Sequence, residues 1–171
     1  MNRQIVFNEN DVGSLKILKL KEKIELQNNS IKVNIIEKSP KTQLEVNEVY
    51  KKIKKFDFIF LSADSENMHS HIDYIAKKYK KAFIHCYYLG YYGYVGPILS
   101  EKNKSYVIKE NQYNFIGSHF NPPSTSPTNA IIANYAVLES LKYLTNIDEC
   151  NLIEKVLQIN FKTLETRIFN F

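Results

Sequence analysis

The strongest constraint on the fold is DFIFLSA at residues 57–63, a short and almost unbroken apolar run. Such a run is typical of a strand that is buried on both faces of a parallel sheet. Helical patterns flank it at about 44–54 and 65–80, and AFIHCYYL at 82–89 is typical of a further strand. Because parallel strands need crossover connections, this alternation predicts an α/β fold with a doubly wound, partly Rossmann-like sheet.

The residues before this unit predict one more helix and one more strand. In LKILKLKEKIEL at 15–26, the residues Ile17, Leu20 and Ile24 fall on one helical face, and the charged residues lie elsewhere. Asn28-Asn29-Ser30 ends that pattern, and IKVNIIE at 31–37 is then expected to form a strand.

After Gly96-Pro97 the pattern changes. VGPIL (95–99) and SYVIKE (105–110) predict antiparallel strands, and 121–129 predicts a loop. With Ser126 as its cap and Pro127 in its first turn, a helix is expected to run to about Thr145. One face of that helix carries Asn134, Val137, Leu141 and Leu144, and residues 156–171 predict a β-hairpin around Lys162 and Thr163.

Composition excludes several classes of protein. Lys plus Arg is 23 and Asp plus Glu is 18, so the net charge is a mild +5. Only two basic residues are arginine, which argues against a nucleic-acid partner. No apolar run approaches the ~20 residues that a bilayer requires, and no signal peptide is present, so we expect a cytoplasmic protein with no membrane partner.

Two charged residues occupy places where a phosphate and its metal commonly bind. Lys16 falls in the first helical turn, where a bound anion would offset the unfavourable helix dipole; the alternative is a solvated lysine. Asp64 follows the buried strand at its carboxyl end, where a carboxylate is well placed to hold Mg²⁺ on a nucleotide. Asp64 is equally suited to cap the next helix.

Three motifs follow one another along the chain. The first motif is Arg3-Gln4 followed by Val12-Gly13 and Lys16, and the second is the strand that ends at Asp64. The third is SPTNAIIANYAVLESLKYLT, which carries Pro127, Asn129, Glu139 and Lys142. In this order the motifs resemble the ThiF family of adenylyltransferases, which includes the ubiquitin-activating enzymes, and the four residues of the third motif match habitual family positions. Ser62-Ala63-Asp64 and FNPPSTSP look closest to the peptide-modifying branch of the microcin C type.

The resemblance implies an ATP-dependent enzyme that adenylates the carboxyl terminus of a peptide or of a ubiquitin-like sulfur-carrier protein. Arg3 would clamp phosphate, Lys16 would steady the developing charge, and Asp64 would hold Mg²⁺. Gln4 would be a secondary contact, and Ser65 stands where relatives carry Asn. Bacteriocin biosynthesis is the implied setting, with a dimer as the expected assembly.

The chain departs from this family in two respects. Relatives usually carry a Gly-rich phosphate loop and an acidic ribose-binding residue ahead of the Arg-Gln pair, whereas this sequence begins at that pair. Gly90, Gly93 and Gly96 do not open a helix and cannot replace the loop. Many relatives also hold zinc with two CxxC pairs, but Cys86 and Cys150 form none, so no zinc site is expected.

We therefore expect residues 1–171 to be a single ThiF-type domain that is truncated at its amino terminus, binds ATP poorly and is inactive alone. The two strands that belong between 31–37 and 57–63 in the family order are missing, which would leave open sheet edges. A gene fragment or a half completed by an amino-terminal polypeptide is favoured over a sheet in which 31–37 and 57–63 pair directly.

A second hypothesis is an inactive ThiF-like subunit that dimerises with an active relative, for which the tyrosine-rich 87–94 could supply an interface. A dehydrogenase or methyltransferase is disfavoured because the chain has no GxGxxG motif. The histidines, at 69, 71, 85 and 119, are scattered and are expected to be surface or packing residues.

Overall fold

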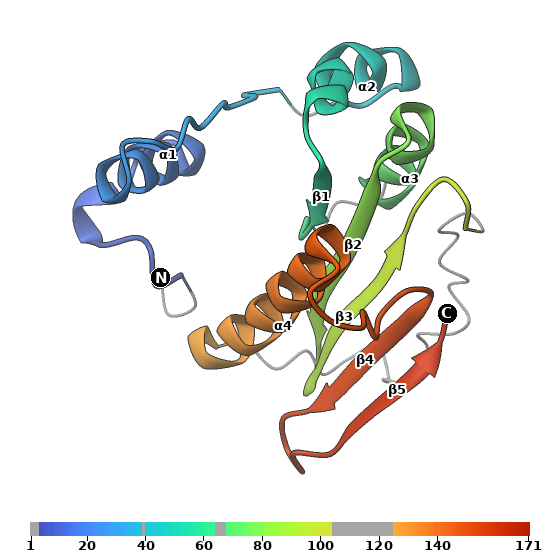
Figure 1. Ribbon diagram of the computed structural model, residues 1–171. Coiled ribbons are helices and arrows are strands. Elements are labelled where there is room, and N and C mark those ends of the chain that lie inside the picture. The colour runs from blue at the N-terminus through green and yellow to red at the C-terminus, as the bar shows by residue number, and fades with distance from the viewer. Residues whose placement is uncertain (1–3, 39, 64–67, 104–124) are drawn as a thin grey trace.

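The computed structural model describes residues 4–38, 40–63, 68–103 and 125–171. Its centre is a five-stranded sheet in the order β1-β2-β3-β4-β5 (Figure 1). β1 and β2 are parallel, and the remaining neighbours are antiparallel. The strands are β1 (Phe58–Leu61), β2 (Ala82–Leu89), β3 (Tyr92–Leu99), β4 (Lys155–Asn160) and β5 (Thr166–Asn170).

Helices cover both faces of this sheet, so the expected doubly wound α/β architecture is confirmed, as is the carboxyl-terminal hairpin of β4 and β5. The structure also confirms the strand predicted at 82–89 and the helix end predicted at Thr145. The helical segments are η1 (Glu9–Asp11), α1 (Lys16–Gln27), α2 (Gln43–Val49), η2 (Tyr50–Lys55), α3 (Met68–Tyr79) and α4 (Ser126–Thr145).

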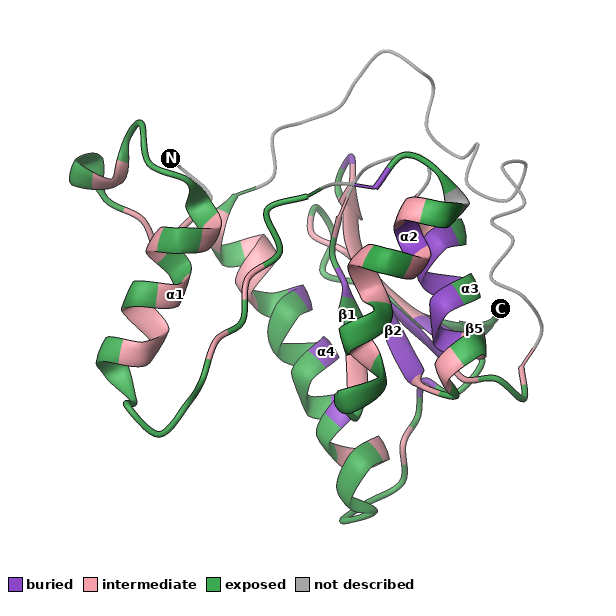
Figure 2. Cartoon of the chain, turned by 90° about the horizontal axis from the view of Figure 1, so that it is seen from above, coloured by how far each residue is buried: buried purple, intermediate pink, exposed green. Residues whose placement is uncertain are grey.

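The core lies in two layers, one on each face of the sheet. On one face, Ile72 and Ala76 of α3 pack against Leu61, Phe83 and Leu99 of the strands. On the other face, α4 packs against β2 and β3, and the buried residues include Ala82, Ile84, Val95, Ile98, Ile132 and Ala136. Figure 2 shows this burial concentrated on the central strands and on the inner sides of α3 and α4.

Helix α4 lies unusually close to the sheet because Gly93 on β3 has no side chain. A Cβ atom there would stand 2.5 Å from Cγ2 of Ile132, closer than real carbon atoms approach. The helix therefore faces β3 with Ile132, Ala136 and Ser140. The face noted in the sequence is the exposed one, since Asn134, Val137, Leu141 and Leu144 all lie in solvent. Thr125, not Ser126, is the amino-terminal cap.

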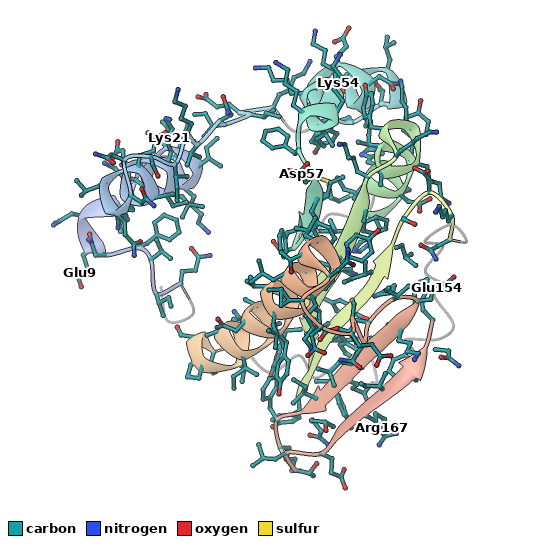
Figure 3. The ribbon with its side chains drawn as sticks, viewed as in Figure 1. Glu9, Lys21, Lys54, Asp57, Glu154 and Arg167 are labelled. Atoms are coloured by element: carbon teal, nitrogen blue, oxygen red, sulfur yellow. The ribbon has the colours of Figure 1, made fainter. Side chains whose placement is uncertain are left out.

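The strand predicted at 31–37 does not form, and this prediction is wrong. The segment belongs to no strand, because a strand needs a neighbour to accept its backbone hydrogen bonds, and no described strand lies beside it. Side chains of α1 hold it instead. Lys21 of α1, labelled in Figure 3, donates to the carbonyl of Val33 at 2.8 Å. The amide of Val33 donates in turn to the carboxylate of Glu25 at 2.9 Å.

Gly90 serves the tight connection between β2 and β3 and adopts a left-handed φ of 64°. The strand predicted at 95–99 is part of the longer β3, whereas 105–110 lies outside the described residues. In the part of the chain that the structure describes, no helix combines the length and apolarity required to span a membrane.

Candidate functional site

The carboxyl ends of the parallel strands β1 and β2 form the edge where ligands of open α/β sheets normally bind. β1 ends at Leu61, which lies beside His85 of β2 in the register. Ser62 and Ala63 continue beyond the strand, and α3 begins at Met68 on the far side of the connection. This edge therefore includes the end of β1, the middle of β2 and the first turn of α3.

Of the five site residues predicted from the sequence, three lie outside the described residues: Arg3, Asp64 and Ser65. Lys16 is the first residue of α1 and is exposed. Leu15, at the cap position, makes no side-chain cap, so the first amide groups of α1 have no side-chain acceptor there. Gln4 lies upstream, and its carbonyl accepts the amide of Phe7 at 3.2 Å. The convergence of these residues on one ligand stays a prediction.

The arm formed by residues 4–37, which carries Gln4 and Lys16, stands to one side of the sheet (Figure 1). Asp11 of η1 forms an ion pair with Lys23 of α1, and the carbonyl of Val6 accepts a hydrogen bond from the same lysine. The arm is thus organised by its own contacts.

The structure brings together two histidines that sequence reasoning treated as scattered. Nε2 of His69, in the first turn of α3, lies 3.0 Å from Nε2 of His85 on β2. Sequence spacing does not reveal this pair, because the two residues lie 16 positions apart on different elements. A usable signal existed: Phe83, His85 and Tyr87 alternate onto one face of β2, and that face lies under the helix that carries His69.

His85 is held in a nonpolar and aromatic setting. Its side chain is only 3% exposed, and the ring stacks on Tyr87 with the ring centroids 4.5 Å apart. Burial, with a smaller contribution from His69, lowers the pKa of His85 to about 3. The imidazole is therefore neutral throughout the physiological range and can accept a proton or a ligand only at its unprotonated nitrogen.

Glu139 and Lys142, which matched habitual family positions, have a structural role here. Glu139 is buried, and it pairs with Lys142 at 3.0 Å and accepts the amide of Asn151 at 2.6 Å. Although burial alone would raise the pKa of Glu139, the hydrogen bonds from Lys142 and Asn151 outweigh it and lower that pKa. These contacts anchor α4 to the segment that leads into β4.

A hollow of about 560 Å³ lies at the carboxyl end of α4 and includes Lys142 and Cys150 in its lining. Burial raises the pKa of Cys150, and it likewise raises the pKa of Cys86 on β2. Thiols with raised pKa values are poor nucleophiles at neutral pH, so neither cysteine is suited to form a thioester.

Comparison with known proteins decides the family. The sequence pattern of the ThiF family matches residues 1–171, the entire length of the chain. The chain belongs to the ThiF family. No curated protein matches its sequence.

Several solved structures have a fold similar to that of this ThiF chain. One is E. coli MccB with ATP, which matches 99% of this chain with a TM-score of 0.82 and 22% sequence identity. E. coli MccB with AMPCPP and MccA has a TM-score of 0.81 and 23% sequence identity, again over 99% of this chain. PaaA has a TM-score of 0.79 and 21% sequence identity over the same share. This chain spans 52%, 51% and 59% of those three chains, so it corresponds to little more than half of each. The agreement establishes the fold that the sequence motifs predicted.

Proposed function

We propose that this chain is the carboxyl-terminal part of an ATP-dependent adenylyltransferase that activates the terminal carboxylate of a peptide or small protein in the cytoplasm. The observation that carries the proposal is the ThiF family match over residues 1–171. Further support comes from similar folds, since MccB has been crystallised with ATP and with MccA, and one MccB structure is described as a microcin C7 biosynthetic enzyme.

The chemical types of the predicted site residues are suited to binding a nucleotide and its metal ion. Asp64 follows the carboxyl end of β1, and carboxylate oxygens are the protein ligands that Mg²⁺ prefers. Lys16 stands at the start of α1, whose first amide groups lack a side-chain cap and suit a phosphate. Arg3 supplies a guanidinium for phosphate oxygens, with Gln4 and Ser65 as further polar contacts.

In the proposed reaction, an oxygen of the substrate carboxylate attacks the α-phosphorus of ATP. The bond from that phosphorus to the bridging oxygen breaks, pyrophosphate leaves, and an acyl adenylate remains. The protein contributes position and charge: Arg3 and Lys16 neutralise the phosphate oxygens, and the substrate is held in line. Mg²⁺, held by Asp64, would supply further neutralisation of the polyphosphate.

We propose that the working enzyme also contains an amino-terminal segment or partner that supplies a Gly-rich phosphate loop. Three observations support this. Among the described residues, β1 has a neighbour on one side only. Helix α1 buries none of its residues, and 31–37 has a strand pattern without a strand partner. An added unit with parallel strands would supply a neighbour for β1, a surface against which α1 can pack and a partner strand for 31–37.

The test is pyrophosphate exchange into ATP. The chain is co-expressed with, or fused to, a ThiF-type amino-terminal segment that carries a Gly-rich loop, and candidate peptides with free carboxyl termini are supplied. We expect peptide-dependent exchange that falls at least about 100-fold in Asp64→Ala. The matched control, Asp57→Ala, changes an exposed aspartate in front of β1 and leaves exchange intact. Exchange that is absent, or equal in wild type and Asp64→Ala, would contradict the proposal.

A second candidate function is an inactive subunit that binds an active ThiF relative, and one observation favours it. Helix α4 exposes a row of large apolar side chains: Ile131, Tyr135, Val137, Leu138, Leu141 and Leu144. Such a patch is typical of a protein interface. If this function holds, Leu138→Asp and Leu141→Asp abolish capture of the relative in a pull-down, and the chain shows no exchange under any of the conditions above.

A further inference from the structure

We propose that His69 and His85 form a binding site for a borderline divalent transition-metal cation, with Zn²⁺ as the type case. This site is not a structural CxxC zinc site, and it does not depend on the proposed function. It lies between the first turn of α3 and the middle of β2, at the carboxyl edge of the parallel strands.

The separation of the two nitrogen atoms is close to what a shared metal requires. In a tetrahedral site with Zn–N bonds of about 2.0–2.1 Å, two imidazole nitrogens stand roughly 3.3 Å apart. The Nε2 atoms of His69 and His85 are 3.0 Å apart in a hydrogen bond. The ion takes the place of the shared proton, which moves to Nδ1 of the donor ring, and the pair opens by a few tenths of an ångström. The ring centroids are 4.4 Å apart, closer than a head-on hydrogen bond would leave them, so the rings are inclined across the contact.

Both rings are also held in place before any ion arrives. Tyr87 stacks on His85, and Tyr94 stacks on Tyr87 with centroids 4.7 Å apart, so His85 belongs to an aromatic column on β2 and β3. His69 is fixed by the start of α3, whose residues Ile72 and Ala76 pack on the sheet. Preorganised ligands lose little conformational entropy when they bind.

The chemistry of the pair selects the class of cation. Neutral imidazole is a preferred ligand of Zn²⁺, Cu²⁺, Co²⁺ and Ni²⁺, whereas Mg²⁺ and Ca²⁺ prefer oxygen. A neutral imidazole binds a metal through the ring nitrogen that carries no proton. Among the described residues, no third His, Cys, Asp or Glu joins the pair.

The experiment is a titration of the full chain, without a polyhistidine tag, with ZnCl₂ in a non-coordinating buffer, followed by calorimetry. We expect one Zn²⁺ per chain and no heat with MgCl₂. His69→Gln weakens the affinity about tenfold or more, while the matched control His71→Gln, on the same helix, stays within about twofold of wild type. Circular dichroism verifies that each variant is folded.

A second measurement needs no variant. In ¹⁵N spectra of the wild-type imidazoles, Zn²⁺ is expected to shift two Nε2 resonances, those of His69 and His85, and to leave His71 in place. Absence of binding up to millimolar Zn²⁺, equal affinity in wild type and His69→Gln, or a shift confined to other histidines would overturn the proposal. Cobalt replaces zinc as a check on the thiols, because binding through Cys86 or Cys150 gives a strong thiolate absorption that a site with imidazole ligands lacks.

Discussion

Helices α1 and α3 are both 12 residues long, yet they are stabilised in different ways. Helix α1 buries no residue. Helix α3 buries five, and its inner side packs on the sheet (Figure 2). An amphipathic pattern is therefore sufficient to predict either helix, but it does not reveal whether the apolar face has found a partner.

Charge pairs along its surface take the place of a core in α1. Lys19 pairs with Glu22, Lys21 with Glu25, and Lys23 with Asp11 of η1. Lys19–Glu22 is exposed and the other two pairs are partly buried. Ion pairs near the surface contribute little individually and are screened by salt. Helix α3 depends instead on Ile72, Ile75 and Ala76, whose apolar burial is not weakened by the screening of charges.

The largest expected effect comes from truncating one apolar side chain in each helix. Ile75 is fully buried, so Ile75→Ala lowers the free energy of unfolding by about 2–5 kcal/mol. Leu20 on α1 is 37% exposed, and Leu20→Ala lowers the free energy of unfolding by less than about 1 kcal/mol. Urea denaturation followed by circular dichroism measures both changes. Equal effects would mean that α1 is packed as firmly as α3.

A smaller effect is expected when the pH falls from 7 to 5. The pKa of His85 is about 3 in the folded chain and near 6.5 when unfolded, so the unfolded state binds more protons between these values. The free energy of unfolding therefore decreases with falling pH, by about 1.4 kcal/mol per unit below 6.5 and by about 2 kcal/mol at pH 5. Urea titrations at the two pH values provide the measurement.

The α1 arm serves as the internal control for that titration. Hydrogen bonds from Lys23 and Lys21 lower the pKa values of Asp11 and Glu25, so these carboxylates stay charged below their ordinary titration range. Their contribution is present above the unfolded pKa values and is lost only as the pH falls below about 4. Hydrogen exchange should consequently show α1 unchanged between pH 7 and 5 after correction for the intrinsic rate. A stability that is constant over that range would contradict the neutral, buried state of His85.

The smallest effect concerns the ion pairs themselves. Glu25→Gln removes the partner of Lys21 and weakens the acceptor for the amide of Val33. Exchange of the amides in α1 and around Val33 is expected to accelerate about twofold, and 1 M NaCl should give a similar acceleration in wild type. The amides of α3 should not respond to either change. A response in α3 would show that the arm and the sheet are energetically coupled.

The sequence predicted those elements whose neighbours follow closely along the chain. β2 and the end of α4 were placed correctly because a compact apolar run, a first-turn proline and a polar stop are local signals. Residues 31–37 have an equally clear strand pattern, but pairing decides whether a strand forms, and α1 takes up the backbone groups of Val33 instead. The local pattern contained no information about that competition.

The candidate site was predictable only in part, for a related reason. Asp64 and Lys16 follow from their places beside a strand and a helix start. The contact between His69 and His85 depends on the register of β1 with β2 and on the packing of α3. Neither can be inferred from the 16 positions that separate the two histidines in the sequence. The buried side of α4 likewise depends on Gly93 of β3, which only the folded sheet places beneath Ile132.

The pairing of Leu61 with His85 offers a way to detect whether β1 and β2 are paired in the correct register. Since alternate residues of a strand point to opposite sides, sliding β2 by a single position would carry the imidazole through to the α4 layer and bring Ile84 or Cys86 beneath α3. The aromatic and imidazole column would then be broken. The mutual ring-current shifts of these side chains thus provide a spectroscopic fingerprint that only the correctly aligned strands can produce.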